Sequence, residues 1–201
     1  MTAADTSAPL FGVVLAAGRS SRFGSCKALA VWNGKSLVEH ALDGLVAAGV
    51  TEVRVVVAAP HAAGVRSQLA RTKTVENPEP DRGMTSSLAV GLGALLEAGT
   101  PRAVLVSLVD HPRVTADTLH ALVQHFDAKK PYALRPTHAG RGGHPIVLSP
   151  LAVADVVACD PTRSFRQILG RGLADLPVAD PFVLDDVDTA GAFETLGRDG
   201  R

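Results

Sequence analysis

The sequence predicts an α/β protein with three layers, in which helices cover both faces of a mostly parallel, mixed central sheet. Short runs rich in Val and Leu alternate along the chain with longer segments of helical periodicity, which is the order typical of layered α/β folds. Three of these runs, 11–16, 53–59 and 103–109, are almost continuously apolar. Strands buried on both faces have this composition.

The other elements follow from periodicity and from helix start and stop signals. Segment 36–48 is expected to be a helix because Leu37, Leu42 and Leu45 recur at helical spacing before Gly49. Further helices are expected at 86–98 and at 115–126 with Thr115 as N-cap, and a final turn and helix at 188–196. A hairpin-like insertion is expected where the runs 132–137 and 145–148 flank the Gly-rich turn 139–143.

The chain shows no internal repeat, low-complexity tract or long linker among its 201 residues. We therefore expect a single domain spanning 1–201, with flexible ends at 1–9 and 197–201. In an open sheet of this kind, ligands bind beyond the carboxyl ends of the strands. The loop after the first run and the segments after Val75 and Val109 are expected to meet there.

Composition excludes several partners. Lys plus Arg number 20, as do Asp plus Glu, so the net charge is zero and there is no basic field for nucleic acid. The two cysteines are too few for a disulfide framework, which favours a reducing compartment. The polar segment 1–9 has no basic residue, and no run approaches the roughly twenty apolar residues of a membrane span. A cytoplasmic protein that contacts no membrane is expected.

Segment 15–29 follows the first apolar run and predicts a loop that holds an anion. Gly18 and Gly24 permit backbone conformations that are closed to other residues. The loop also contains hydroxyls and cations, from Arg19, Ser20, Ser21, Arg22 and Lys27. Backbone N–H groups together with Arg and Lys suit a triphosphate. The spacing is not that of a Walker A motif, and a polar strand-to-helix connection is the alternative interpretation.

Carboxylates near the predicted strand ends suggest a magnesium site. Asp110 follows the run 103–109 directly, and nucleotide-bound Mg²⁺ takes one or two carboxylates with phosphate oxygens and water. Asp186 and Asp188 offer a second carboxylate. The competing interpretations are local, because Asp110 could cap the turn at Pro112 and Asp188 could cap the last helix.

Two further segments are open to local and functional interpretations. Segment 77–88, from Asn77 to Leu88, has two interpretations. It could be a turn followed by a helix that Thr85 or Ser86 caps, or its helix could begin at the ligand site, with the N-terminus facing the ligand. The glycines of 140–145 fit a hairpin turn or a ligand border equally well.

Taken together, these motifs resemble the MobA-like NTP transferases, which are nucleotidyltransferases that attach CMP or GMP to molybdopterin. The matching stretches are Leu-Ala-Ala-Gly-x-Ser-Ser-Arg-x-Gly-x-x-Lys from Leu15, Gly-Met-x-x-Ser-Leu from Gly83, Asp-x-Pro from Asp110, Gly-His-Pro from Gly143 and Asp-x-Asp-Thr from Asp186. They occur in the family's order between residues 13 and 189. The resemblance implies a Rossmann-like nucleotidyltransferase fold and transfer of a nucleotide to a phosphate acceptor with release of pyrophosphate.

The resemblance also implies residue roles. Catalysis falls to Lys27, Arg22 and Asp110, and Mg²⁺ to Asp110 and Asp188, with Asp186 as the less favoured second ligand. Nucleotide binding falls to Leu15, Ala16, Ala17, Gly18, Arg19, Ser20, Ser21, Gly24, Lys27, Asn77, Gly83, Met84, Ser86 and Ser87. Acceptor binding falls to Arg141, Gly143 and His144. The chain departs from the family pattern at His111, where Gln or Met is commoner, and at Ala190, where Pro is usual.

Ala17 bears on the choice of nucleotide. Cytidylyl enzymes of the family usually have Leu-Ala-Ala-Gly and guanylyl enzymes Leu-Ala-Gly-Gly, so CTP is the expected donor and molybdopterin the expected acceptor. The alternatives are a guanylyltransferase, a sugar-phosphate nucleotidyltransferase, or a non-catalytic nucleotide-binding regulator or chaperone of a client molybdenum enzyme.

Overall fold

The computed structural model describes residues 8–69 and 72–199 and contains a central sheet of eight strands. The strand order is β10-β7-β9-β6-β1-β4-β5, with β8 paired to β7. The strands are β1 (Leu10–Leu15), β4 (Glu52–Val57), β5 (Thr74–Glu76), β6 (Ala103–Leu108), β7 (Ala133–His138), β8 (Arg141–Gly142), β9 (Ile146–Leu148) and β10 (Leu173–Pro177). Only β8 and β9 run antiparallel to their neighbours in this described sheet. The prediction of a mostly parallel, mixed sheet is confirmed.

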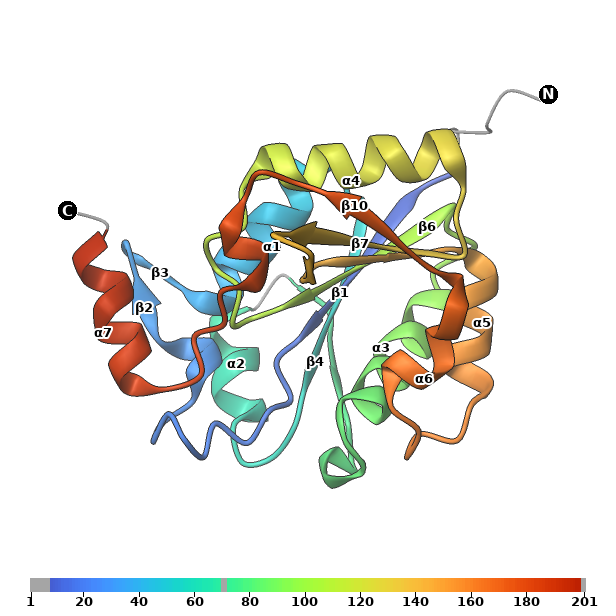
Figure 1. Cartoon of the computed structure of the whole chain (residues 1–201). Coiled ribbons are helices and arrows are strands. Elements are labelled where there is room, and N and C mark those ends of the chain that lie inside the picture. The colour runs from blue at the N-terminus through green and yellow to red at the C-terminus, as the bar shows by residue number, and fades with distance from the viewer. Residues whose placement is uncertain (1–7, 70–71, 200–201) are drawn as a thin grey trace.

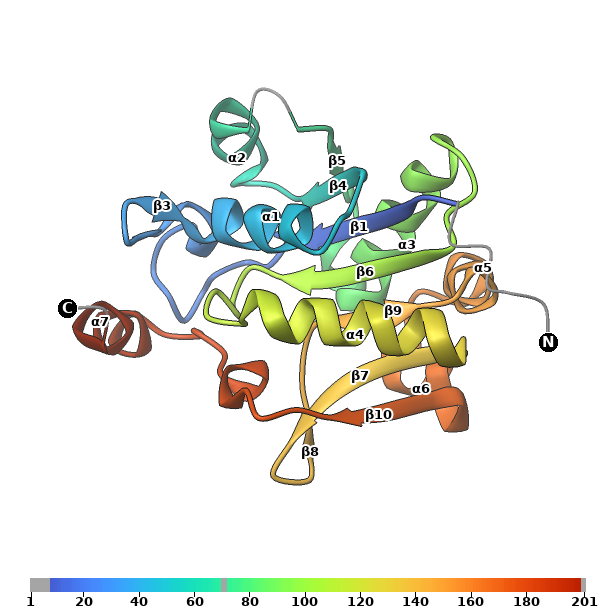
Figure 2. The same cartoon turned by 90° about the horizontal axis from the view of Figure 1, so that it is seen from above.

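Helices cover both faces of the sheet, as Figures 1 and 2 show. One face carries α1 (Leu37–Ala47) and α4 (Ala116–Lys129), and the other carries α3 (Met84–Leu96), α5 (Pro150–Ala158) and α6 (Phe165–Leu169). The remaining elements are α2 (Ala62–Gln68), α7 (Ala190–Asp199), the hairpin of β2 (Val31–Trp32) and β3 (Lys35–Ser36), and the 3-10 turns η1 (Lys27–Leu29), η2 (Pro80–Arg82), η3 (Gly170–Gly172) and η4 (Pro181–Leu184). The predicted three-layer Rossmann-like arrangement is therefore correct.

The core divides along the sheet. Val14 packs in the cluster beneath α1 and α4 with Leu45 and Leu122, whereas Val13 packs in the opposite cluster with Leu92. Adjacent residues of a strand point to opposite faces, so both must be apolar when both faces are covered. This explains why the central strands read as continuous apolar runs.

The predicted cap at Thr115 is present and Ser36 caps a second helix, whereas α3 begins at Gly83 with no side-chain cap, so neither Thr85 nor Ser86 caps it. The hydroxyl of Ser36 accepts a hydrogen bond from the Glu39 backbone N–H, and the Glu39 carboxylate accepts one from the Ser36 backbone N–H at 2.8 Å, which completes a capping box. Thr115 caps α4 by accepting from the N–H of Thr118 at 3.3 Å.

Two sequence predictions need correction. The two runs 132–137 and 145–148 pair antiparallel as β7 and β9, as a hairpin requires, but they are not an insertion, because β9 lies between β6 and β7 in the central sheet and its three residues are buried. The last helix begins at Ala190, and it is capped by Thr189, whose hydroxyl accepts from the Ala192 N–H at 3.1 Å, while the Asp188 carboxylate pairs with Lys27. This helix continues to Asp199, beyond the predicted end at 196.

The topology defines where a ligand can bind. From β1 the chain proceeds to β4 and β5 on one side of the sheet and returns to β6 on the other side of β1. Such a reversal leaves a crevice beyond the carboxyl ends of the two strands. The loop after β1 and Asp110 after β6 both lie at this point. No helix of the described residues is long and apolar enough to cross a membrane.

Candidate active site

A cavity of about 240 Å³ opens at the carboxyl ends of β1 and β6; we call it the β1–β6 cavity. Its lining residues are Leu15, Ala16, Ala17, Gly18, Ser20, Lys27, Ala28, Pro80, Gly83, Met84, Ser87, Leu108, Val109 and Asp110. They come from the loop after β1, the segment around η2 and the end of β6. The structure thus brings three of the sequence-predicted segments to one hollow.

The loop after β1 is organised around Ser20. Ser20 and Gly24 have φ angles of 52° and 81°, in the left-handed region that favours glycine. The Ser20 carbonyl accepts from the N–H groups of Phe23 and Gly24, and its hydroxyl accepts from the Lys27 N–H at 3.1 Å. Ser20 therefore closes the loop and directs Lys27 toward the cavity.

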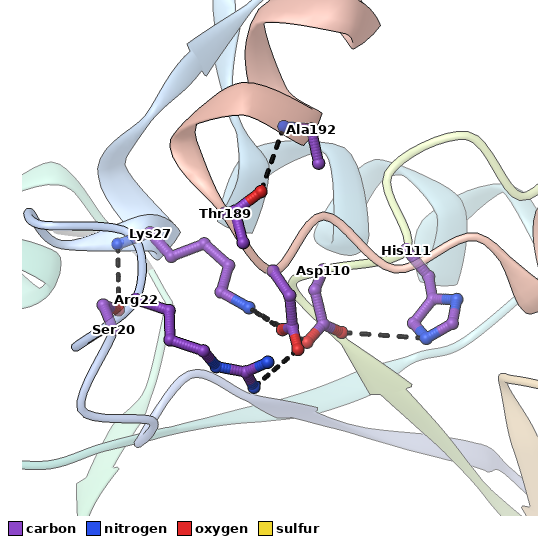
Figure 3. Close-up of polar contacts among 8 residues, drawn as sticks. Ser20, Arg22, Lys27, Asp110, His111, Thr189 and Ala192 are labelled. Atoms are coloured by element: carbon purple, nitrogen blue, oxygen red, sulfur yellow. Dashed lines mark hydrogen bonds and ion pairs between the residues drawn. The ribbon is translucent and has the colours of Figure 1, made fainter.

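Lys27 bridges the two predicted metal carboxylates. Its Nζ lies 3.2 Å from Asp110 Oδ2 and 2.7 Å from Asp188 Oδ1. Arg22 reaches the other oxygen of Asp188 at 2.7 Å, and Figure 3 shows Lys27 and Arg22 approaching from the same loop. The Lys27 side chain is only 12% exposed. Residues separated by more than 160 positions thus form one charge cluster at the cavity wall.

The cluster keeps Asp188 ionised. The hydrogen bond from Lys27 lowers the pKa of Asp188, and the charges of Lys27 and Arg22 add to this effect against the opposing cost of burial. The segment carrying Asp188 is tied to β6, because the Val187 N–H donates to the Asp110 carbonyl at 2.9 Å. Asp186, by contrast, is exposed, and Asp185 pairs with Arg113. The structure brings Asp188, and not Asp186, to Asp110.

The donor set suits a hard divalent cation. Asp110 Oδ1 is buried and has no hydrogen-bond partner among the described residues, and its neighbour His111 Nε2 lies 3.8 Å away. Two carboxylates already converge on one cation, the Lys27 ammonium. No group of three or more His, Cys, Asp or Glu in the described part of the chain could hold a metal. Two carboxylates with phosphate and water as the other ligands are what Mg²⁺ commonly uses.

The segment between β5 and α3 supplies both framework and lining. Asn77 is 2% exposed, and its Nδ2 donates to the hydroxyls of Ser86 and Ser87, each at 2.9 Å. Asn77 and Ser86 therefore lie behind the wall, where they hold the start of α3. Gly83, Met84 and Ser87 reach the cavity, and Gly83 needs its φ of 97° to turn into the helix.

Four predicted loop residues lie outside the lining: Arg19, Ser21, Arg22 and Gly24. Arg19 instead donates from Nε to Asp81 Oδ1 at 2.7 Å. This exposed ion pair connects two segments that both line the cavity, the loop after β1 and η2. Sequence reasoning missed Asp81, since nothing local marks it as a partner of Arg19.

Helix α7 fixes the loop from outside. The ring of Phe23 meets that of Phe193 edge-to-face at 5.5 Å, and Trp32 Nε1 donates to the Leu196 carbonyl at 3.2 Å. Together with Val187, these residues form a separate apolar cluster. A C-terminal helix that packs on the loop after β1 holds Asp188 beside Lys27.

The predicted acceptor residues divide into two groups. Arg141 is exposed on β8, whereas Gly143 and His144 line a second cavity of about 270 Å³ that also contains Met84. The His144 ring lies 5.3 Å from the ring of His111, the neighbour of Asp110. The second cavity is therefore adjacent to the charge cluster.

The fold and the charge cluster define the class: an α/β protein with a cationic loop and paired carboxylates at the switch point of a parallel sheet. Residues 12–176 match the MobA-like NTP transferase domain, and the chain belongs to that family of nucleotidyltransferases.

The chain is similar to two named proteins and to a solved structure along most of its length. Nicotine blue oxidoreductase of Paenarthrobacter nicotinovorans is 34% identical over 197 residues, which cover 92% of this chain and 95% of that protein. A probable molybdenum cofactor guanylyltransferase of Pyrococcus horikoshii is 30% identical over 81% of this chain and 74% of its own length. The crystal structure of Rv0371c from Mycobacterium tuberculosis, 24% identical, superposes with a TM-score of 0.78 over 94% of this chain and 98% of that chain. That protein has also been solved in complex with manganese.

Proposed function

We propose that this protein transfers CMP from CTP to the phosphate of molybdopterin and releases pyrophosphate. The observation that carries the proposal is the convergence of Asp110 and Asp188 on the ammonium of Lys27, where Lys27 and Asp110 line the β1–β6 cavity. A triphosphate requires cations and a carboxylate-held metal at one place. Family membership and a relative named as a molybdenum cofactor guanylyltransferase support the same chemistry.

The proposed reaction needs no covalent intermediate on the protein. An acceptor phosphate oxygen attacks the α-phosphorus in line, a new P–O–P bond forms, and the bond to the leaving pyrophosphate breaks. Lys27 lines the cavity and Arg22 contacts the same Asp188, so both cations would stabilise charge that shifts toward pyrophosphate. Gly18 and Ser20 line the same cavity as Lys27, where they would position the triphosphate.

Asp110 and Asp188 are the residues that would hold Mg²⁺, which when bound neutralises phosphate charge and orients the leaving group. The approach of phosphate would draw the Lys27 ammonium away from the carboxylates, because a triphosphate carries more negative charge than they do. Lys27 is thus proposed to keep the carboxylate pair neutralised before the substrate arrives.

The choice of CTP rests on Ala17, which lines the cavity. A methyl group beside the base would crowd a purine more than a pyrimidine. The guanylyltransferase names among the relatives favour GTP as the alternative. Incubation with each nucleoside triphosphate, Mg²⁺ and molybdopterin, followed by mass analysis of the product and measurement of pyrophosphate, tests the proposal. A molybdopterin guanine dinucleotide product would overturn the CTP assignment, and absence of pyrophosphate would overturn transfer itself.

A second candidate is an oxidoreductase, which is favoured by the 34% identity to nicotine blue oxidoreductase over nearly the whole of both chains. The two functions predict different products. Oxidation of NADH or NADPH in the presence of a quinone-like dye, without any nucleoside triphosphate, would indicate the second function. Pyrophosphate release that requires both a triphosphate and an acceptor would indicate the first.

A further inference from the structure

Helix α7 is attached to the rest of the protein through a small apolar cluster of its own. The buried members are Phe23, Val187 and Leu196, and Ala30, Trp32 and Phe193 pack against them; we call these six residues the α7 cluster. Among the described residues, none of the six belongs to either of the two larger clusters that flank the central sheet. Figure 1 shows α7 beside the β2–β3 hairpin, at one end of the molecule. The docking of α7 therefore depends on contacts that the main core does not supply.

The α7 cluster joins the two segments that carry the charge cluster. Phe23 follows Arg22 in the loop after β1, and Val187 precedes Asp188. Phe23 and Val187 are buried, whereas the side chains of Arg22 and Asp188 keep 72% and 28% of their exposure. Each of these charged residues thus has a buried apolar neighbour that anchors its backbone, and both anchors lie in the same cluster.

Phe193 connects α7 to the loop after β1. Its ring meets the Phe23 ring edge-to-face, with the centroids 5.5 Å apart and the planes at 71°, which is a favourable geometry for an aromatic pair. The Phe193 N–H donates to the Thr189 carbonyl at 3.0 Å, so one hydrogen-bonded helical turn separates the ring from the residue that follows Asp188. A shift of the Phe193 ring would therefore be passed on to Asp188.

The loop after β1 and the segment that carries Asp188 are thus joined twice, by charge and by aromatic packing. Lys27 and Arg22 each hold one oxygen of Asp188 at 2.7 Å. In the proposed function a triphosphate competes directly for these two cations. The contact between Phe23 and Phe193 contains no group for which a phosphate or a metal ion competes. It is therefore the connection that persists when the substrate is bound.

We propose that Phe193 is a positioning residue for Asp188. By packing on Phe23, it keeps the Asp188 carboxylate beside Asp110 when Lys27 turns to the substrate, so that both carboxylates stay available to a divalent cation. Phe193 acts from outside the β1–β6 cavity, since it is absent from the lining. This inference rests on the proposed function, and it extends the site to a helix that the substrate does not touch.

The direct test is equilibrium binding of Mn²⁺ alone, followed by electron paramagnetic resonance, to wild type, Phe193→Ala, Phe193→Tyr and Glu194→Ala. Phe193→Tyr keeps the ring. Glu194 is the matched control, because it is the next residue of α7, is exposed and lies outside the α7 cluster. Alanine favours helix, so neither Ala variant weakens α7 by itself. Phe193→Ala should raise the Kd for Mn²⁺ roughly tenfold, and the other two variants should bind as wild type does.

Turnover separates positioning from a general loss of structure. Phe193→Ala should need roughly tenfold more Mg²⁺ for half-maximal pyrophosphate release, while the KM for CTP stays unchanged and the maximal rate recovers at high Mg²⁺. A purely structural role would lower the rate by the same factor at every Mg²⁺ concentration, and that result would overturn the assignment.

Trp32 reports whether α7 is docked. It is the only tryptophan of the chain, and its Nε1 donates to the Leu196 carbonyl of α7 at 3.2 Å. Quenching of its fluorescence by acrylamide should therefore increase in Phe193→Ala and stay unchanged in Phe193→Tyr and Glu194→Ala. Unchanged quenching in Phe193→Ala would mean that α7 docks without the ring, which overturns the assignment.

Weaker Mn²⁺ binding in Phe193→Ala alone supports the positioning role. Unchanged Mn²⁺ affinity in that variant, equal weakening in Glu194→Ala, or no Mn²⁺ binding in wild type overturns it. If Phe193→Ala does not fold, Phe193→Leu, which keeps an apolar side chain without a ring, takes its place with the same outcomes. Mn²⁺ binding that depends on Phe193 in a protein that releases no pyrophosphate from any nucleoside triphosphate would refute the proposed function and leave the positioning role standing.

Discussion

Substituting Lys27 by Ala tests the centre of the site. The change removes the ammonium that lies 3.2 Å from Asp110 and 2.7 Å from Asp188. Removing one partner of a fully buried ion pair typically costs about 3–5 kcal/mol. Here the two carboxylates keep 22% and 28% exposure and Arg22 still contacts Asp188. We therefore expect a loss of about 1–2 kcal/mol in the free energy of unfolding at pH 7.

This stability loss should depend on pH. Lys27 lowers the pKa of Asp188 in the folded protein, so their interaction stabilises the fold above the ordinary carboxylate pKa near about 4 and is lost as the pH falls through the lowered value. The difference between wild type and Lys27→Ala in urea unfolding should accordingly shrink between pH 7 and pH 3. A difference that stays constant over this range would refute the electrostatic reasoning.

Catalysis should suffer more than stability. With the proposed phosphate contact gone, the rate of pyrophosphate release per folded molecule should fall on the order of a hundredfold or more. Lys35→Ala is the matched control, because Lys35 forms an exposed pair with Asp43 at 2.5 Å, away from the cavity. It should leave the free energy of unfolding nearly unchanged, because solvent screens an exposed ion pair, and it should leave turnover intact. Full turnover in Lys27→Ala would make Lys27 purely structural.

Three other substitutions probe separate features. Asp110→Asn keeps the side-chain volume but weakens metal binding, so turnover at saturating Mg²⁺ should fall roughly a hundredfold; a rate within a few-fold of wild type removes Asp110 from the mechanism. Ala17→Gly should narrow the ratio of kcat/KM for CTP over GTP by about tenfold, and an unchanged ratio places selectivity elsewhere. Asp180→Ala should lower the free energy of unfolding, measured in urea, by about 2–4 kcal/mol, because Asp180 accepts hydrogen bonds from Thr115, Thr118 and Phe182. A loss below about 1 kcal/mol would contradict this expectation.

The Asp180 effect should also show a pH signature. Burial opposes its charge, but the hydrogen bonds from Thr115, Thr118 and Phe182 outweigh this cost and lower the pKa of Asp180. Its contribution is present above the ordinary carboxylate pKa and is lost as the pH falls through the lowered value. The wild-type advantage over Asp180→Ala should therefore decline in acid.

Local sequence was sufficient for the scaffold. The continuous apolar runs, in which apolar and polar residues do not alternate, predicted strands that are buried on both faces. Ser36 and Thr115 cap their helices, as Ser and Thr commonly do. Errors arose where long-range pairing decided the outcome. Nothing in the run 145–148 shows that β9 enters the sheet between β6 and β7, since a hairpin arm and a central strand have the same composition when both are buried.

The site divides in the same way. The sequence by itself determined which chemical groups were available: a Gly- and Ser-rich cationic loop after a buried strand, a carboxylate after another, and a cluster of late aspartates. Only the tertiary structure decided that Asp188 and not Asp186 meets Lys27, and that Arg19 turns to Asp81. The physical reason is that backbone propensities act over a few residues, whereas each of these choices depends on where α7 and η2 pack against distant strands.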